Sequence, residues 1–285
     1  MSSIRQYLRI VTDRLTPALD DAGEARDAAY IIFEDVAGYS RNFIFADGDR
    51  ELTDFMQGKI DAVVNKIISG TPVQYAVGTA RFMGNDYSVN PSVLIPRPET
   101  AALVDMISDD FGSTPDTRVL DIGTGSGCIA ISIAKTLPFA QVEAWDISDD
   151  ALATARENAL KLKAKVSFIK QDALTAKAPG QACYDIIVSN PPYICQSEEK
   201  DMDPRVYACE PSQALFVPDS DPLVFYRAIA AYATKALKSG GKLYFEINSR
   251  FPDEIKELLE QNGFENISVT RDFKGNYRYA VASQK

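Results

Sequence analysis

The sequence predicts an α/β fold, in which a small N-terminal helical domain precedes a seven-stranded, doubly wound sheet that is mainly parallel. Three observations lead to this prediction. Residues 1–72 show helical spacing of apolar residues and few strand signals. From Thr117 onward, short apolar runs alternate with helical segments. A glycine-rich turn joins the first of these runs to its helix, as is usual at the first crossover of a doubly wound sheet.

Residues 1–72 are predicted to form a helical domain of about four helices. In the last of these helices, apolar residues recur at helical spacing from Leu52 to Ile68. Ser69-Gly70-Thr71-Pro72 then ends the helix, because glycine accommodates a helix C-terminus and proline does not continue it. Such a domain could be a packing cap or a module that recognises a partner, and its residues favour neither.

Residues 73–93 are predicted to form a β-hairpin linker. Apolar and polar residues alternate from Val73 onward, on both sides of a turn at Gly84-Asn85-Asp86. Residues 94–285 then form the main domain, which begins with a segment where two prolines bracket Arg97.

The main domain is predicted to alternate strands with crossover helices. The expected strands cover residues 118–122, 141–145, 165–169, 184–189, 242–247, 267–271 and 277–281. The expected helices cover residues 101–108, 128–136, 149–162, 223–237 and 253–261. Such alternation gives a parallel sheet with helices on both faces. The terminal hairpin around Lys274-Gly275-Asn276 is expected to add an antiparallel edge strand.

The bulk composition is that of a globular protein. The chain has 285 residues, 46% of them hydrophobic, and a formal net charge of −10. Its pI of about 4.7 disfavours charge-driven binding of DNA or RNA. No apolar run is long enough to span a bilayer, and the first residues lack the apolar core of a signal peptide. We therefore expect a cytoplasmic protein with no membrane partner and no sequence-specific contact with nucleic acid.

The absence of histidine limits the chemistry that the chain can perform. It excludes Ser-His-Asp and Cys-His catalysis and removes the commonest zinc ligand. The four cysteines form no C-x-x-C pair, so we predict no metal site and expect reduced, structural thiols. Cys195 and Cys209 lie close in sequence to a candidate site, which leaves a reactive thiol open there.

The turn Gly123-Thr124-Gly125-Ser126-Gly127 predicts a ligand site after the first strand. Its glycines let the backbone approach a ligand, and the following helix offers free N–H groups. Asp146 ends the next strand, where a carboxylate can bind both hydroxyls of a ribose. Asp172 follows the third strand and could accept a hydrogen bond from an adenine amino group. Together they predict a nucleoside-containing cofactor, although Gly125–Ala130 also fits the G-x-G-x-x-A pattern of NAD-binding folds.

Asn190-Pro191-Pro192-Tyr193 follows the fourth predicted strand and is the most informative segment of the chain. Its two prolines fix two φ angles and remove two backbone donors, so Asn190 is held on a stiff loop. The Asn190 amide can accept from and donate to a planar amide or amine. Because the carboxyl ends of parallel strands meet at one edge of a sheet, we expect the loop to lie beside the nucleoside site.

These motifs resemble those of S-adenosylmethionine-dependent amino-methyltransferases, which have a Rossmann-like fold. The resemblance rests on Asp121-Ile122-Gly123-Thr124-Gly125-Ser126-Gly127 and Asn190–Tyr193. Further motifs make the whole chain similar to the HemK/PrmC family of peptide chain release factor glutamine N5-methyltransferases. They are Gln74-Tyr75, Phe82-Met83-Gly84, Leu94-Ile95-Pro96-Arg97-Pro98-Glu99-Thr100 and Glu210-Pro211-Ser212-Gln213-Ala214-Leu215. One departure is Ala173, where some relatives carry an aromatic residue that packs on the adenine.

The resemblance implies a reaction in translation termination. A methyl group would pass from S-adenosyl-L-methionine, leaving S-adenosyl-L-homocysteine, to the side-chain amide nitrogen of the glutamine in the Gly-Gly-Gln motif of class I release factors. Residues 1–72 would contact the release factor, and the enzyme would be a monomer.

The resemblance also assigns roles to the site residues. Gly123, Thr124, Gly125 and Gly127 would hold the methionine end of the cofactor, Asp146 the ribose, and Asp172 and Ala173 the adenine. Ser126 and Asn190 would also contact the cofactor. The Asn190 oxygen and the Pro191 carbonyl would each accept one N–H of the target amide, and Tyr193 would pack against that amide after Pro192. Arg97 and Glu99 are expected to form a supporting ion pair.

Four alternatives remain open at this point. Asn-Pro-Pro-Tyr suits any planar amino target, so an adenine N6 DNA methyltransferase or a glutamine methyltransferase of a ribosomal protein is possible. The G-x-G-x-x-A match allows an NAD-dependent oxidoreductase, which leaves Asn190–Tyr193 unexplained. A non-catalytic adaptor with a degenerate cofactor fold is the fourth.

Overall fold

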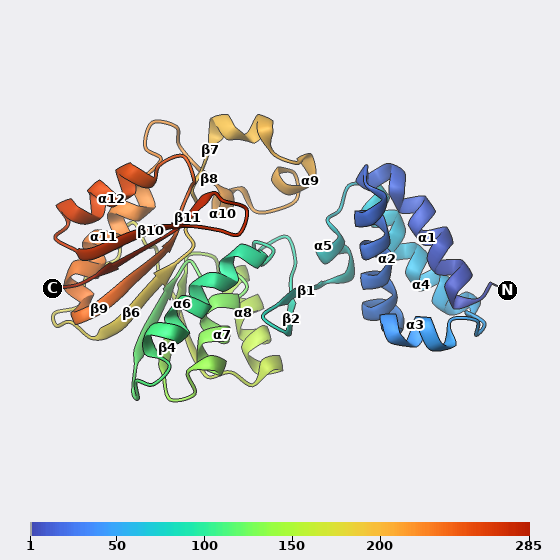
Figure 1. Ribbon diagram of the computed structural model, residues 1–285, viewed down its shortest axis with the longest axis horizontal. Coiled ribbons are helices and arrows are strands. Elements are labelled where there is room, and N and C mark those ends of the chain that lie inside the picture. The colour runs from blue at the N-terminus through green and yellow to red at the C-terminus, as the bar shows by residue number, and fades with distance from the viewer. Residues whose placement is uncertain (1) are drawn as a thin grey trace. The chain divides into compact units, whose positions relative to one another are not determined.

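The computed structural model describes residues 2–285, which divide into two compact units. The first unit runs to Thr79 and also includes Pro204–Cys209, and the second comprises Ala80–Asp203 and Glu210–Lys285 (Figure 1). Within residues 2–285, no helix is both long and apolar enough to cross a membrane.

The first unit is helical, as the apolar spacing predicts. Its helices are α1 (Ile4–Leu19), α2 (Ala22–Ala37), α3 (Arg41–Asp47), α4 (Asp54–Ile68), α5 (Val73–Val77) and α9 (Pro204–Tyr207). A capping box begins α1: Gln6 N–H donates to the Ser3 hydroxyl at 3.3 Å, and the Gln6 side chain accepts the Ser3 N–H at 3.0 Å. The apolar faces of α1, α2 and α4 share one core.

Only part of the predicted hairpin linker is correct. β1 (Thr79–Phe82) and β2 (Asn85–Ser88) pair in a two-stranded sheet around the expected turn. Residues 73–77, which were expected to be extended, form the short helix α5 instead. Val73 and Ala76, three residues apart, both contribute to the helical core, and Gly78 ends the helix at φ +83°.

The second unit is built on a mixed seven-stranded sheet within the described residues. Its strands are β3 (Arg118–Ile122), β4 (Gln141–Asp146), β5 (Val166–Lys170), β6 (Tyr184–Ser189), β9 (Leu237–Glu246), β10 (Glu265–Arg271) and β11 (Tyr277–Ser283). They lie in the order β10-β11-β9-β6-β3-β4-β5. β3, β4, β5, β6 and β9 are mutually parallel.

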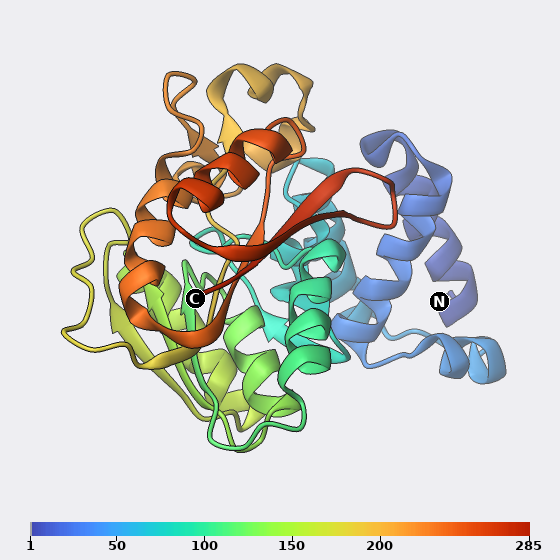
Figure 2. The same ribbon diagram turned by 60° about the vertical axis from the view of Figure 1, so that its left-hand side comes forward.

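Helices cover both faces of this sheet, as predicted (Figures 1 and 2). One face packs against α6 (Ala101–Phe111), α7 (Cys128–Thr136) and α8 (Asp149–Leu162), and the other against α11 (Val224–Ala236) and α12 (Pro252–Gln261). Because successive strand residues point to opposite faces, Val119 packs in the core on the side of α6, α7 and α8, and Leu120 in the core on the side of α11 and α12.

Short elements complete the second unit. They are the 3-10 helices η1 (Pro98–Thr100) and η2 (Gln196–Asp201), the short helix α10 (Ser212–Leu215), and the paired strands β7 (Ile194–Cys195) and β8 (Phe216–Val217).

The terminal hairpin adds an antiparallel edge strand, as expected, and β10 rather than the last strand β11 is the one at the edge. β11 runs antiparallel to both neighbours and is inserted between β9 and β10, which forms the edge. Burial explains the order: Ala280 and Ala282 of β11 are fully buried, whereas most residues of β10 are exposed.

Candidate active site

The glycine loop between β3 and α7 folds back on the end of β4. The N–H groups of Gly123 and Thr124 both donate to the Trp145 carbonyl, at 2.9 and 2.8 Å. Gly123, Gly125 and Gly127 have φ values of +77°, +54° and +82°, a region that L side chains rarely adopt. A Cβ at Gly123 or Gly125 would meet no atom within 4 Å. These two glycines therefore leave room for a ligand beside the backbone.

Gly127 has a different role from the other two glycines. A Cβ there would lie 2.9 Å from Ile131 Cδ1 and 3.2 Å from Ala155 Cβ. The missing side chain thus allows α7 and α8 to pack closely behind the loop.

Asp146 links the loop to the turn after β4. Its Oδ2 accepts the Gly125 N–H at 2.9 Å, and its Oδ1 accepts the Ser148 N–H at 2.9 Å. Asp172 begins the turn after β5, where its carboxylate accepts the Leu174 N–H at 2.8 Å. Both carboxylates are thereby oriented by backbone groups.

A cavity of about 260 Å³ lies at this edge of the sheet and brings together most of the predicted residues. The predicted residues that line it are Gly123, Thr124, Gly125, Ser126, Asp146, Asp172, Ala173, Asn190, Pro191 and Pro192. The expected convergence of the carboxyl ends of β3, β4, β5 and β6 is therefore confirmed. Gly127 and Tyr193 are not among the lining residues.

Asn190 is partly exposed at the cavity wall, and its Nδ2 donates to the Thr100 hydroxyl at 3.3 Å. Its Oδ1 accepts no hydrogen bond within residues 2–285. Just before the loop, the buried Ser189 hydroxyl donates to the Ile122 carbonyl at 2.6 Å, which ties β6 to β3. The amide oxygen is thus held in place with its acceptor capacity unused.

Tyr193 is anchored away from the cavity. Its hydroxyl donates to Glu246 at 3.0 Å and accepts from Arg278 at 3.1 Å. Burial and the neighbouring Glu246 carboxylate raise the pKa of this phenol far above its usual value. The tyrosine therefore holds the loop through its hydroxyl.

Sequence reasoning placed the supporting ion pair wrongly. Arg97 pairs with Glu210, whose buried carboxylate also accepts the Ile95 N–H at 3.1 Å. Glu99 pairs with Lys274 at 2.6 Å. Among the other lining residues, Ser92, Val93, Phe225 and Ile229 carried no sequence signal. Further lining residues lie in the two motifs Leu94–Thr100 and Glu210–Leu215 that carried the family resemblance, namely Leu94, Pro96, Arg97, Thr100, Pro211, Gln213 and Ala214.

Asp121 is a buried carboxyl directly beneath the glycine loop. Its Oδ2 accepts from the Thr124 hydroxyl at 2.7 Å and from the Ala130 N–H at 3.2 Å. Its Oδ1 has no hydrogen-bond partner. Burial raises the pKa of Asp121 to about 7, and the nearby Asp146 carboxylate adds to the rise.

The thiols close to this region are not activated. Burial raises the pKa of Cys128 to about 12, and burial together with Glu198 raises the pKa of Cys195 to about 11. A thiol with such a pKa stays protonated at neutral pH and is a poor nucleophile. We therefore exclude Cys195 as the reactive thiol.

The residues present fit a nucleoside with a cationic substituent. The open glycines allow close approach of a ligand to the backbone, and Asp146 and Asp172 supply acceptors at the ends of two neighbouring strands. Ala173, Ile147 and Leu174 add apolar lining on the same side. The cavity therefore suits S-adenosylmethionine, with a nucleoside side formed by β4 and β5 and an amide side formed by Asn190.

Comparison with known proteins gives a consistent result. Residues 8–78 match the family model of the PrmC N-terminal domain, and residues 98–206 match that of the methyltransferase small domain. A protein of Bacteroides thetaiotaomicron named release factor glutamine methyltransferase is 42% identical over 285 residues, which is 100% of both chains. One of the same name from Flavobacterium psychrophilum is 42% identical and covers 96% of this chain and 97% of its own.

A solved structure shares the fold at lower identity. The crystal structure of a methyltransferase from Pyrococcus furiosus superimposes with a TM-score of 0.52 at 19% identity, covering 71% of this chain and 90% of that one. This similarity supports the Rossmann-like assignment of the sheet.

Proposed function

The chain belongs to the release factor glutamine methyltransferase family and is therefore an S-adenosylmethionine-dependent methyltransferase. We propose that it methylates the side-chain amide nitrogen, N5, of the glutamine in the Gly-Gly-Gln motif of class I peptide chain release factors. The observation that carries the proposal is the unused Oδ1 of Asn190, held at the wall of the cavity that the glycine loop and Asp146 also line.

Asn190 would orient the target amide. An amide nitrogen is a weak nucleophile, because its lone pair is delocalised into the carbonyl. The Asn190 Oδ1 and the Pro191 carbonyl would each accept one N–H of the glutamine, which fixes the nitrogen and favours a lone pair directed at the methyl group. Such alignment can contribute on the order of 7–11 kcal/mol to lowering the barrier. S-adenosylmethionine supplies the electrophilic methyl group on a sulfonium.

No strong base is needed in this scheme. Tyr193 keeps its proton, since its pKa is raised and its hydroxyl donates to Glu246. The chain has no histidine, and the nearby Cys195 stays protonated. The nitrogen becomes acidic only as it forms its new bond to carbon, after which water can take the proton.

We further propose that the first unit contacts the body of the release factor. It includes the residues that match the PrmC N-terminal domain, and it exposes Phe45 and Phe55. Aromatic side chains bury a large apolar area in protein interfaces, so these two are candidates for contact with the release factor. Replacing both with serine should lower methylation of a whole release factor and leave methylation of a short Gly-Gly-Gln peptide unchanged. The monomeric state and the cytoplasmic location stay predictions.

The function is tested with radiolabelled S-adenosylmethionine. The enzyme is incubated with a release factor, with the same factor carrying Gln→Ala in its Gly-Gly-Gln motif, with ribosomal proteins, and with DNA. We expect label only on the unaltered release factor. Label on both factors, or on neither, would contradict the proposal.

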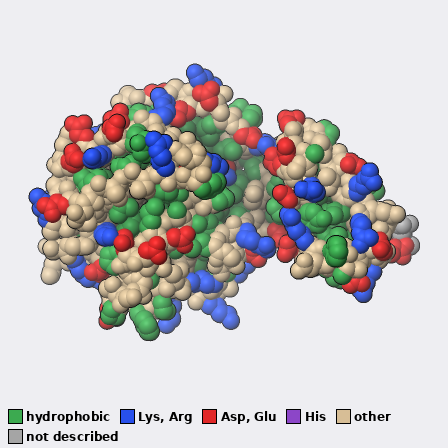
Figure 3. All heavy atoms as spheres, in the orientation of Figure 1, with side chains coloured by type: hydrophobic (Ala, Val, Ile, Leu, Met, Phe, Trp, Pro, Cys, Tyr) green, Lys and Arg blue, Asp and Glu red, His purple; other side chains and the backbone are tan. Residues whose placement is uncertain are grey.

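The two remaining substrates give distinct outcomes in the same experiment. Label on a ribosomal protein alone would identify that protein as the substrate. Label on DNA would restore the adenine methyltransferase alternative. On the face drawn in Figure 3, acidic and basic side chains of the described residues alternate with no continuous basic surface. Together with the net charge of −10, this disfavours binding of DNA as the substrate.

A further inference from the structure

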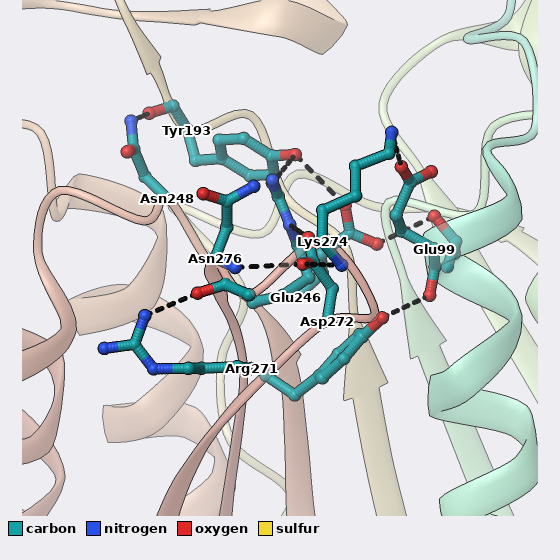
Figure 4. A network of polar contacts seen from close by, with 12 residues as sticks. Glu99, Tyr193, Glu246, Asn248, Arg271, Asp272, Lys274 and Asn276 are labelled. Atoms are coloured by element: carbon teal, nitrogen blue, oxygen red, sulfur yellow. Dashed lines mark hydrogen bonds and ion pairs between the residues drawn. The ribbon is translucent and has the colours of Figure 1, made fainter.

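Glu246 reaches both ends of the Asn190–Tyr193 loop from the end of β9. The residue is buried, with 2% of its surface exposed. One carboxylate oxygen accepts from the Thr100 hydroxyl at 2.7 Å, and the other accepts from the Tyr193 hydroxyl at 3.0 Å (Figure 4). A single carboxylate therefore connects to the first residue of the loop through Thr100 and to the last residue directly.

The Thr100 hydroxyl determines the orientation of the Asn190 amide. A hydroxyl has one proton, and the proton of Thr100 is donated to the Glu246 carboxylate. Its oxygen is then left as an acceptor, and it accepts from Asn190 Nδ2 at 3.3 Å. If the Asn190 amide were flipped, its Oδ1 would face the acceptor oxygen of Thr100. Two opposed acceptors repel, so the amide nitrogen turns towards Thr100 and the oxygen turns away from it.

The far end of the loop is fixed by the same strand end. Asn248 Nδ2 donates to the Tyr193 carbonyl at 2.9 Å, and Tyr226 donates its hydroxyl proton to the Glu246 carbonyl at 3.1 Å. Arg278, from β11, donates to the Tyr193 hydroxyl at 3.1 Å. Figure 4 shows Tyr193, Glu246 and Asn248 gathered in this network. The loop is therefore held at both ends, by Thr100 at Asn190 and by Glu246, Asn248 and Arg278 at Tyr193.

We propose that Glu246, acting through Thr100, is a positioning residue that fixes the Asn190 amide with its oxygen available to the target. The inference rests on the proposed function, in which that oxygen accepts an N–H of the glutamine amide. With the amide reversed, the Nδ2 donor would oppose the N–H donor of the target. The target nitrogen would lose its alignment, while the cofactor contacts at the glycine loop and Asp146 would be unaffected.

The first test removes the Thr100 hydroxyl, which orients the Asn190 amide. We expect Thr100→Val to lower kcat for release factor methylation about 10- to 100-fold, and the Kd for S-adenosylmethionine to stay within twofold. Thr100→Ser keeps the hydroxyl and should retain at least a third of the kcat. Thr117→Val is the matched control, because Thr117 is equally buried and its hydroxyl donates to the Thr114 carbonyl. Thr117 lies at the amino end of β3, whereas the cavity lies at the carboxyl end. Thr117→Val should lower the Tm comparably and leave kcat unchanged.

The second test uses a double-mutant cycle, because coupled residues give non-additive losses. In Glu246→Gln, the new amide can donate to Thr100, which frees the Thr100 proton to donate to Asn190 and favours the reversed amide. We expect Glu246→Gln to lower kcat at least tenfold in the wild-type background. In the Thr100→Val background, the same change should lower kcat by a smaller factor.

Several results would overturn the inference. They are an unchanged kcat in Thr100→Val, an equal loss in Thr100→Ser, a loss in Thr117→Val as large as that in Thr100→Val, or losses of Glu246→Gln that are equal in both backgrounds. The wild-type enzyme distinguishes failure of the proposed function from failure of the positioning role of Glu246. If the wild type left the release factor unlabelled, the proposed function would fail together with this inference. If the wild type and Thr100→Val labelled it equally, the inference alone would fail.

Discussion

The Asp146 carboxylate accepts the N–H of Gly125 at 2.9 Å, so the end of β4 is joined directly to the loop after β3. The carboxylate that is proposed to bind the ribose thus also shapes the loop proposed to hold the methionine end. Cofactor affinity and loop conformation should therefore change together when Asp146 is replaced.

Asp146→Ala removes the acceptor of both the Gly125 and the Ser148 N–H groups. Hydrogen bonds to a charged group contribute about 1.5–3 kcal/mol, so the Kd for S-adenosylmethionine should rise about 10- to 100-fold. Asp146→Asn keeps one amide oxygen and should give an intermediate Kd. Isothermal titration with S-adenosylmethionine measures both Kd values, and an unchanged Kd in Asp146→Ala would refute the ribose assignment.

Asn190→Ala should separate turnover from cofactor binding. The loss of one oriented group at the reacting centre typically costs about 100- to 1,000-fold in kcat. Asn190 makes no hydrogen bond to the glycine loop or to Asp146, so the Kd for S-adenosylmethionine should remain within about twofold, far less than the tenfold change that corresponds to about 1.4 kcal/mol. Rapid-quench turnover and equilibrium binding are the measurements. Collapse of cofactor binding with high residual turnover would mean that the role of Asn190 is wrong.

Two glycines of one loop should respond differently to alanine. Gly127→Ala adds a Cβ 2.9 Å from Ile131 Cδ1 at a positive φ, so it should lower the free energy of unfolding by about 2–4 kcal/mol. Gly123→Ala meets no atom within 4 Å, so only the backbone strain of about 1–2 kcal/mol remains. Its Cβ would instead occupy space beside the cavity and weaken cofactor binding. Urea unfolding and titration should therefore rank the two variants in opposite orders.

Asp121 should make stability depend on pH. Its pKa in the folded protein, about 7, lies above the usual value of 3.8, so the folded state holds this proton over a range in which the unfolded chain has released it. The stability contribution is fully present below about pH 4 and is lost as the pH rises through about 7. Between pH 5 and pH 8 the wild type should therefore lose about 2–3 kcal/mol more than Asp121→Asn. Parallel pH profiles of urea unfolding would contradict this assignment.

Local signals were sufficient for the elements that carry the cofactor site. The residue limits of α7, α8, β3 and β6 follow from apolar runs and their bounding turns, because both signals lie within a few residues. The same reasoning failed at 73–77, where a five-residue segment is too short for helical and strand spacing to differ reliably. Pro72 before it and Gly78 after it are compatible with either state.

Long-range pairing was beyond local signals. Arg97 meets Glu210 across 113 positions, and Glu99 meets Lys274 across 175. Nothing in the segment around Arg97 distinguishes these partners from a neighbouring Glu99. The position of β11 between β9 and β10 is also set by pairing between distant segments. The role of Glu246 was missed for the same reason, since the side-chain partners of its carboxylate, Thr100 and Tyr193, lie on two distant segments.

Because of the strand order, the groups proposed to hold the nucleoside and those proposed to orient the acceptor amide lie on different halves of the sheet. The chain adds β4 and β5 on one side of β3, and then crosses to place β6 and β9 on the other. The groups proposed to hold the nucleoside lie on the first side, and those proposed to hold and orient the acceptor amide lie on the second. Substitutions in the second half can then accumulate without weakening the binding of the methyl donor. A chain built in this way could evolve towards a new acceptor in small steps and remain a working methyltransferase throughout.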